Sequence, residues 1–232
     1  VEVPQVDTDL CNYCGKCSRF CAFNAITVLQ NQWLLSPELC KACGGCYRVC
    51  PQDALSETTR RMGIVESGQT QEGVRLVSGK LDLGEAMATP VIREVWKRAP
   101  EEGSAIIDCP PGSACAFVSA VEPADFCLLV TEPTPFGVHD LGKALDVLAV
   151  MDKPAGVVVN RSDGGDNRVW ELCAQRGVHV LMEIPFDENL ARQYAHGKVA
   201  SVIDSHWRER FESLWEVISD QLEKQDISAR SA

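Results

Sequence analysis

Cysteine spacing constrains this chain more than any other feature of its sequence. Eight of the twelve cysteines fall within residues 11–50, in two copies of the spacing C-x2-C-x2-C-x3-C. The copies begin at Cys11 and Cys40, and a short apolar stretch follows each of them. Two copies of one short motif predict a module with an internal pseudo-twofold axis. Tight clustering favours metal ligation in a reducing compartment over the disulfide framework of a secreted protein.

This spacing, with a proline after the second copy, resembles that of bacterial-type ferredoxins with two [4Fe–4S] clusters. In that pattern the first three cysteines of a copy surround one cluster, and the fourth ligates the other cluster. One cluster is therefore expected to be bound by Cys11, Cys14, Cys17 and Cys50. The second cluster is expected to be bound by Cys40, Cys43, Cys46 and Cys21.

Two other interpretations of the cysteines stand beside the clusters, namely structural zinc and disulfides. Zinc sites usually pair two C-x2-C units across a longer gap, whereas here eight cysteines fall in a doubled four-cysteine pattern. The glycines of the motif also fit a cluster module. Gly15, Gly44 and Gly45 are expected to let backbone N–H groups approach the sulfur atoms.

Composition narrows the classes of partner. The chain has 232 residues, 45% of them apolar and 24% charged, which excludes wholesale disorder, collagen-like repeats and a coiled coil. Its net charge of −11 repels phosphate backbones, so no nucleic-acid partner is expected. The longest apolar runs, such as 126–130 and 155–159, are too short to span a bilayer. No secretory signal opens the sequence, so we expect a cytoplasmic protein without a membrane partner.

Three segments divide the chain. Residues 1–57 form the expected ferredoxin domain, and residues 58–85 are expected to be a connector hairpin with strands at 64–67 and 74–78. Residues 86–232 alternate helix-like and strand-like patterns. Strands are expected at 105–108, 125–131, 155–160 and 178–184, and helices at 87–98, 135–151, 166–176, 187–195 and 204–224. Near-continuous apolar strands between amphipathic helices predict an α/β fold, a parallel sheet with helices on both faces.

Several strings in this α/β part carry a family resemblance. IIDCPPG at 106–112 is similar to the Walker B strand of the MinD/ParA/Mrp group of P-loop ATPases, and LVTEPTPFGVHDL at 129–141 is closer still. The chain as a whole resembles MinD-superfamily ATPases that carry an inserted ferredoxin domain. Further matching strings lie at 39–46, 79–86, 158–161 and 184–187. The resemblance covers essentially the whole chain and implies the C-terminal part of a MinD-like nucleotide-binding domain over residues 86–232.

One departure from the family is large. The family begins with a strand, a Walker A loop with an extra signature lysine and a switch aspartate, and none of these occurs in this chain. The match to G-x-x-x-x-G-K at 137–143 is no substitute, because no Ser or Thr follows the lysine and the glycines lie inside an expected helix. The sequence therefore implies an incomplete MinD-like P-loop fold. Mg-ATP is expected only with the missing segment, which leaves open whether this chain is an enzyme.

The resemblance implies a nucleotide site at the carboxyl ends of the parallel strands. Asp108 would be the catalytic residue, holding the Mg²⁺ shell and ordering water, and its alternative role is to cap a turn. Asn160 would contact the adenine edge, and its alternative is a turn-forming asparagine. The other residues expected to bind the nucleotide are Pro110, Pro111, Gly112, Pro185 and Asp187.

Four cysteines lie outside the two motifs. Cys109, Cys127 and Cys173 are expected to pack in the core, and Cys115 is expected to be buried as a small hydrophobic residue, with a redox or ligand role as its alternative. The apolar stripe of the helix expected at 204–224 should pack on the sheet. A membrane surface is the alternative, but the polar face of this helix mixes charges of both signs.

Three functions follow. The first is a redox-coupled nucleotide switch, in which the ferredoxin domain relays low-potential electrons to a redox partner and ATP, bound across a homodimer interface as the resemblance implies, gates their delivery. The second is an ATPase that assembles or carries an iron–sulfur cluster or metallocofactor for an assembly partner. The third is a ferredoxin-type electron carrier with no ATPase activity in this truncated chain.

Overall fold

The chain divides into two compact units. The computed structural model describes residues 1–100, 102–162 and 167–230, without the side chains of residues 203 and 224–230. The first unit is Val1–Ile106 and the second is Ile107–Ala232. The first unit extends past the connector because helix α3, Thr89–Trp96, packs against hairpin strands β5, Gly63–Gln69, and β6, Arg75–Leu81.

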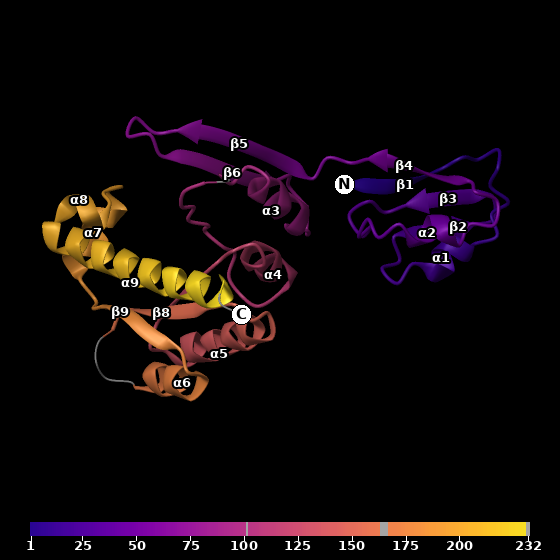
Figure 1. Ribbon diagram of the computed structural model, residues 1–232. Helices are drawn as coiled ribbons and strands as arrows, with labels where there is room; N and C mark the ends of the chain where they lie inside the picture. The colour runs from indigo at the N-terminus through magenta and orange to yellow at the C-terminus, as the bar shows by residue number, and fades with distance from the viewer. Residues whose placement is uncertain (101, 163–166, 231–232) are drawn as a thin grey trace. The chain divides into compact units, whose positions relative to one another are not determined.

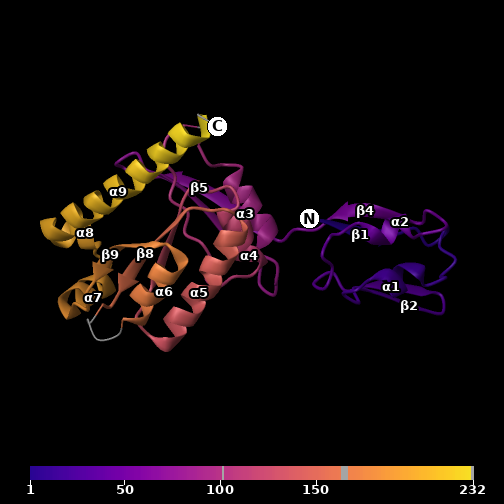
Figure 2. The same cartoon turned by 60° about the horizontal axis from the view of Figure 1, so that its bottom comes forward.

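Two short antiparallel ribbons build the N-terminal part of the first unit. Strand β1, Glu2–Val6, pairs with β4, Leu55–Thr59, and β2, Ile26–Leu29, pairs with β3, Gln32–Leu35. Helices α1 and α2 begin two residues after the second cysteine of each motif and span Lys16–Phe20 and Gly45–Arg48. Figure 2 shows α2 with β1 and β4, and α1 with β2. The predicted pseudo-twofold repeat is therefore present in the structure.

Backbone conformation repeats with the same 29-residue offset that separates Cys11 from Cys40. Positive φ angles fall at matching positions of the two copies, where L-residues are uncommon. They are 54° at Tyr13 and 51° at Ala42, 70° at both Gly15 and Gly44, and 52° at Asn24 and 49° at Asp53. The two copies therefore fold alike even where their side chains differ.

A glycine sets the approach of helix α3 to the hairpin. A Cβ atom on Gly79 of β6 would lie 2.6 Å from Val91 Cγ1 and 2.9 Å from Val95 Cγ2. Real Cβ atoms do not make contacts this short. Helix α3 thus lies directly on the backbone of the strand, and only glycine fits at this position.

The second unit is built on a three-stranded parallel sheet. Its order is β7, Cys127–Thr131, then β8, Ala155–Asn160, then β9, His179–Ile184. The helices are α4, Cys115–Val121; α5, Pro135–Val150; α6, Arg168–Arg176; α7, Glu188–Ala195; α8, Ala200–Ile203; and α9, Ser205–Arg230. The predicted α/β class with a parallel sheet is correct.

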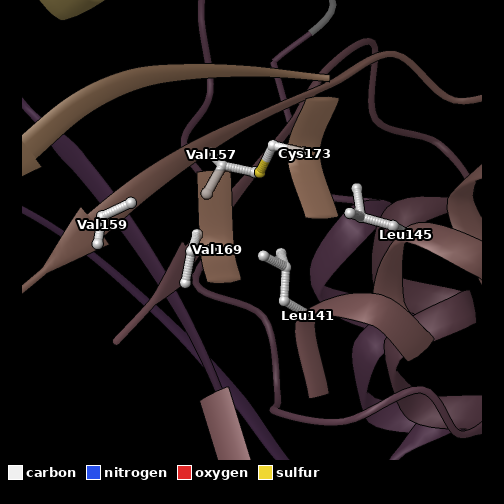
Figure 3. Packing of buried hydrophobic residues seen from close by; sticks show 6 residues of the cluster. All are labelled: Leu141, Leu145, Val157, Val159, Val169 and Cys173. Carbon is white, nitrogen blue, oxygen red and sulfur yellow. The ribbon is translucent and has the colours of Figure 1, made fainter. Parts of the chain in front are cut away.

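Helices cover both faces of this sheet (Figure 1). On one face, Leu141 and Leu145 of α5 and Val169 and Cys173 of α6 pack against Val157 and Val159 of β8 (Figure 3). On the other face, Trp207, Leu214 and Ile218 of α9 pack on Val158 and Met182. The stripe of α9 therefore packs on the sheet, as predicted.

One strand expected from the sequence is absent from the structure. Residues 105–108 are not a buried strand: they have no regular secondary structure, and Ile106 is 87% exposed. A strand needs a neighbour to pair with, and no described strand pairs with this segment. Helices α4 and α8 were not predicted. The expected start of α6 at Asp166 lies outside the described residues.

The described helices include none that is both long enough and apolar enough to cross a membrane.

Candidate functional site

The first unit contains a hollow that gathers four cysteines from both motifs. Cys11, Cys14 and Cys17 come from the first copy and Cys50 from the second. We call this the first hollow. Its walls include Val28 and Trp33 of the β2–β3 ribbon, with Ala54 and Leu55 at the start of β4. The four cysteines are those predicted to surround one cluster.

A second hollow gathers the remaining four motif cysteines. Cys40, Cys43 and Cys46 come from the second copy and Cys21 from the first. The walls are again largely apolar, and they include Pro4, Phe20, Phe23, Ala25, Ile26 and Tyr47. Each hollow thus takes three cysteines from one copy and one from the other, as the ferredoxin pattern requires.

The local backbone explains why these segments curve around a hollow. Tyr13 and Gly15 have positive φ between the first three cysteines, as do Ala42 and Gly44 in the second copy. Such turns direct successive backbone N–H groups toward one point, an arrangement that binds anions and is common at iron–sulfur sites. The backbone N–H of Ala25 already donates to Cys21 Sγ, at 3.4 Å. These N–H groups would stabilise negatively charged sulfur.

A buried cysteine thiol must lose its proton before its sulfur can bind a metal. Burial raises the pKa of Cys46 to about 11, although N–H donation from the backbone at Tyr47 lowers it. Cys14 and Cys43 are exposed, and all twelve cysteines of the chain are free of disulfide bonds. Cysteine binds metal as the thiolate, so loading of a cluster would release protons from such buried thiols.

The side chains fit a cluster better than a single zinc ion. In a tetrahedral zinc site the Zn–S distance of about 2.3 Å brings the sulfur atoms close together. Across the described ranges, no three His, Cys, Asp or Glu side chains converge closely enough to hold one metal ion. The cysteines instead line the walls of a wider space. The hollows therefore suit an inorganic group that separates its ligands.

The residues predicted for the nucleotide site fall into two groups. Asp108, Pro110, Pro111 and Gly112 lie in an irregular segment before α4, where Asp108 is exposed and Gly112 has φ of 95°. Cys109, which follows Asp108, packs against the group of buried residues that includes Cys127 and Leu148. Burial raises the pKa of Cys109, and the charge of Asp108 raises it further.

Asn160 and Pro185 belong to the second group, at the carboxyl ends of two neighbouring strands. Asn160 is the last residue of β8 and pairs with Ile184, the last residue of β9, which precedes Pro185. Asp187 caps helix α7, because its carboxylate accepts a hydrogen bond of 3.0 Å from the backbone N–H of Leu190. That carboxylate therefore has a structural role in this state.

Three residues that sequence reasoning did not assign to a site meet at the same sheet edge. Glu132 follows β7, Arg161 follows β8 and Phe186 follows β9. Arg161 Nε lies 3.7 Å from Glu132 Oε1, and its guanidinium lies 5.8 Å from the centre of the Phe186 ring. Arg161 also has a positive φ of 51°, a conformation that is unfavourable for most side chains and often found at functional sites.

The remaining cysteines behave differently from one another. Cys127 and Cys173 are buried, as predicted, and burial raises the pKa of both thiols. Cys109 is half-buried. The expectation that Cys115 is buried is wrong, because it lies exposed at the start of α4. The helix packs through Phe117, Ala120 and Val121 instead.

Comparison with known proteins identifies the N-terminal module. Residues 4–27 and 34–56 match the 4Fe–4S binding domain family, once for each cysteine motif. The chain therefore carries a ferredoxin-type domain that binds 4Fe–4S clusters.

Two proteins of Methanocaldococcus jannaschii are similar to the chain. MJ0578, named an uncharacterized protein, is 28% identical over 221 residues, which cover 94% of this chain and 75% of MJ0578. MJ0579, also named uncharacterized, is 30% identical over 125 residues, or 53% of this chain and 43% of MJ0579. The chain thus spans about three quarters of the length of one relative and less than half of the other.

A solved structure relates the fold to a known architecture. The MinD cell division protein of Aquifex aeolicus matches with a TM-score of 0.50 and 20% identity, over 66% of this chain and 68% of that protein. At this identity the likeness concerns the fold alone. The chain therefore combines a MinD-like fold with a ferredoxin domain.

Proposed function

We propose that this chain, a ferredoxin domain joined to a MinD-like α/β unit, relays low-potential electrons to a partner protein under the control of ATP. The observation that carries the proposal is the sorting of the eight motif cysteines into two hollows, four in each, on a chain that also has a MinD-like fold. One fold supplies redox centres and the other is an architecture built around a nucleotide.

The chain's own residues would do three things in the redox half. The eight thiolates would ligate the clusters, and each bound cluster would accept and release one electron at low potential. Backbone N–H groups at the turns with positive φ would stabilise the sulfur atoms. Apolar side chains such as Val28, Leu55 and Ile26 would limit access of water.

The nucleotide half needs a phosphate loop that these 232 residues do not contain. We propose that a separate segment, from a longer polypeptide or a partner subunit, supplies this loop and an additional strand. Strand β7 is an edge strand to which such a strand could add, because among the described strands it pairs with β8 alone. With the loop present, Asp108 would order the Mg²⁺ shell, and Asn160 and Pro185 would contact the base.

The first experiment is an anaerobic calorimetric titration of Mg-ATP into this chain, with iron and sulfide assayed on the same sample. We expect about eight irons and no saturable nucleotide binding, because the phosphates have no loop amides or lysine to bind. Saturable binding would contradict the need for a separate segment. A protein without iron would contradict the redox half of the proposal.

The catalytic role of Asp108 is tested once the loop-bearing segment is present. Asp108→Ala should abolish ATP hydrolysis, whereas the matched variant Asp220→Ala, on the exposed side of α9, should leave hydrolysis unchanged. Undiminished turnover in Asp108→Ala would contradict the assigned role.

Cluster lability separates an electron relay from a cluster carrier. A relay keeps its iron through repeated reduction and oxidation, whereas a carrier transfers its cluster to an apo-acceptor. We expect the chain to retain its iron, since each hollow offers four cysteines to its cluster. No coordination position would then be left for a ligand from outside the chain. Rapid transfer to an apo-ferredoxin would favour the assembly function instead.

A further inference from the structure

The two hollows are alike in their cysteines but differ in several wall residues, one of which carries a buried polar group. Trp33 of β3 lines the first hollow, opposite its strand partner Val28. Applying the 29-residue offset places Pro4 at the corresponding position, and Pro4 lines the second hollow. Trp33 carries an N–H donor, whereas Pro4 has no donor at all.

The indole N–H of Trp33 is buried and has no acceptor. Among the described side chains, the buried nitrogen and oxygen atoms without a hydrogen-bond partner are Trp33 Nε1, Arg60 Nε and Arg98 Nη1. Neither arginine lines a hollow. Buried donors in proteins almost always have a partner, so an orphaned one calls for an acceptor that the protein atoms do not supply.

We infer that Trp33 Nε1–H donates a hydrogen bond to a sulfur atom in the first hollow and thereby makes the cluster held there the more easily reduced of the two. This inference rests on the proposed binding of two clusters. Thiolate and sulfide sulfur are negatively charged acceptors, and hydrogen bonds to them are among the factors that set cluster potentials. An N–H dipole stabilises the extra negative charge of the reduced state, so it raises the potential.

Two clusters with different reduction potentials would give electron transfer within the domain a preferred direction. An electron arriving at either cluster would reside on the one bound by Cys11, Cys14, Cys17 and Cys50. The pseudo-twofold backbone provides two similar sites, and the replacement of Trp33 by Pro4 at the matching position is the difference that removes an N–H donor from one of them.

The test uses the full chain with its clusters loaded and a reductive titration followed by electron paramagnetic resonance. Trp33→Phe should lower the equilibrium constant for reduction of the first cluster about tenfold, which is about 59 mV for one electron. The second cluster should keep its potential. Iron content should stay near eight per chain. The control Trp215→Phe, a half-exposed tryptophan on α9 in the other unit, should move neither potential.

A second substitution separates the hydrogen bond from the shape of the side chain. Replacing Trp33 by 3-benzothienylalanine exchanges the N–H for a sulfur atom and nearly keeps the ring. It should lower the potential of the first cluster as Trp33→Phe does. It should also remove the exchangeable-proton coupling that pulsed electron paramagnetic resonance is expected to detect in the wild type. This readout does not depend on any catalytic activity.

The outcomes distinguish a failure of the hydrogen bond assigned to Trp33 from a failure of cluster binding. Intact clusters whose potentials do not change in either variant would overturn the assignment to Trp33 and leave cluster binding standing. A fall confined to Trp33→Phe, with the isostere unchanged, would assign the effect to packing and also overturn the hydrogen bond. Wild-type protein without about eight irons would overturn the proposed function and this inference together.

Discussion

At the scale of single residues, the ligand role of a cysteine follows from its place in the backbone rather than from its chemistry alone. The motif cysteines sit beside turns with positive φ, and each lines one of the two hollows. Cys127 and Cys173 lie in a strand and a helix, where they pack as small apolar groups. Spacing in the sequence separates these classes, because the motif cysteines are grouped with two or three residues between them, whereas Cys127 and Cys173 each stand alone.

Substitution of one motif cysteine should affect one cluster. Cys14→Ser removes a thiolate from the first hollow, so we expect the iron content to fall by about half, from eight to about four per chain. Cys115→Ser is the matched control, because Cys115 is exposed and outside both motifs, and it should keep all the iron. Equal iron loss in both variants would mean that Cys14 is not a specific ligand.

A second residue-scale prediction concerns the start of helix α5. The side chain of Thr134 accepts a hydrogen bond of 3.0 Å from the backbone N–H of Gly137. Thr134→Ala should lower the free energy of unfolding of the second unit by about 0.5–2 kcal/mol, since it leaves that N–H without its cap. Thr134→Ser keeps the acceptor and should lose much less. Chemical denaturation checks both, and equal losses would show that the cap contributes nothing.

At the scale of elements, the sequence predicts those whose signals are local. Ala155–Asn160 is a strand with the predicted bounds because its run of valines is buried on both faces. Helix α5 starts at Pro135 after its cap, also as predicted. Residues 105–108 were expected to be a strand from the same kind of apolar pattern, but a strand also needs a neighbour. The sequence does not predict helix α4, because the helix begins after Ala114 and no capping side chain marks its start.

Sites that depend on register are also hidden from the sequence. Glu132, Arg161 and Phe186 follow three different strands, and nothing in their spacing indicates that they meet. Their contact becomes visible only when β7, β8 and β9 are aligned in parallel. The cluster motifs could be found because their ligands are close in sequence, whereas this edge could be only partly anticipated, through Asn160 and Pro185.

One element-scale prediction tests the packing of α3 on its hairpin. Gly79→Ala would place a Cβ against Val91 and Val95, so we expect the free energy of unfolding of the first unit to fall by about 1–3 kcal/mol. Gly68→Ala is a matched control in the partner strand, where a Cβ would meet nothing within 4 Å. Its effect should stay within about 0.5 kcal/mol. Thermal unfolding of both variants decides the matter, and similar losses would contradict the close approach.

At the scale of the whole molecule, the motif cysteines and the MinD-like sheet belong to different compact units. All eight motif cysteines lie within Val1–Ile106. The groups of buried apolar side chains around β7, β8 and β9 belong to Ile107–Ala232. Each unit has buried apolar residues of its own. The α/β fold class of the second unit could be predicted, because strand-like and helix-like segments alternate along residues 86–232.

Because the hollows are complete within one unit, residues 1–106 expressed alone should still bind about eight irons per chain. Anaerobic expression with iron and sulfide analysis checks this, and the full chain prepared in parallel is the control. A fragment that folds but binds no iron would show that the second unit contributes to the cluster sites.

The crossed sharing of cysteines has a mechanical consequence. Each cluster would join three cysteines of one copy to one cysteine of the other, so the two copies would be fastened to each other twice. A bound cluster of this kind would restrict the unfolded chain as a covalent cross-link does. The restriction would last only as long as the cluster remains bound. Oxygen that destroys the clusters would therefore erase the shape of the domain along with its charge-carrying centres. The same event would disable the electron relay proposed above and change the surface offered to its proposed partner.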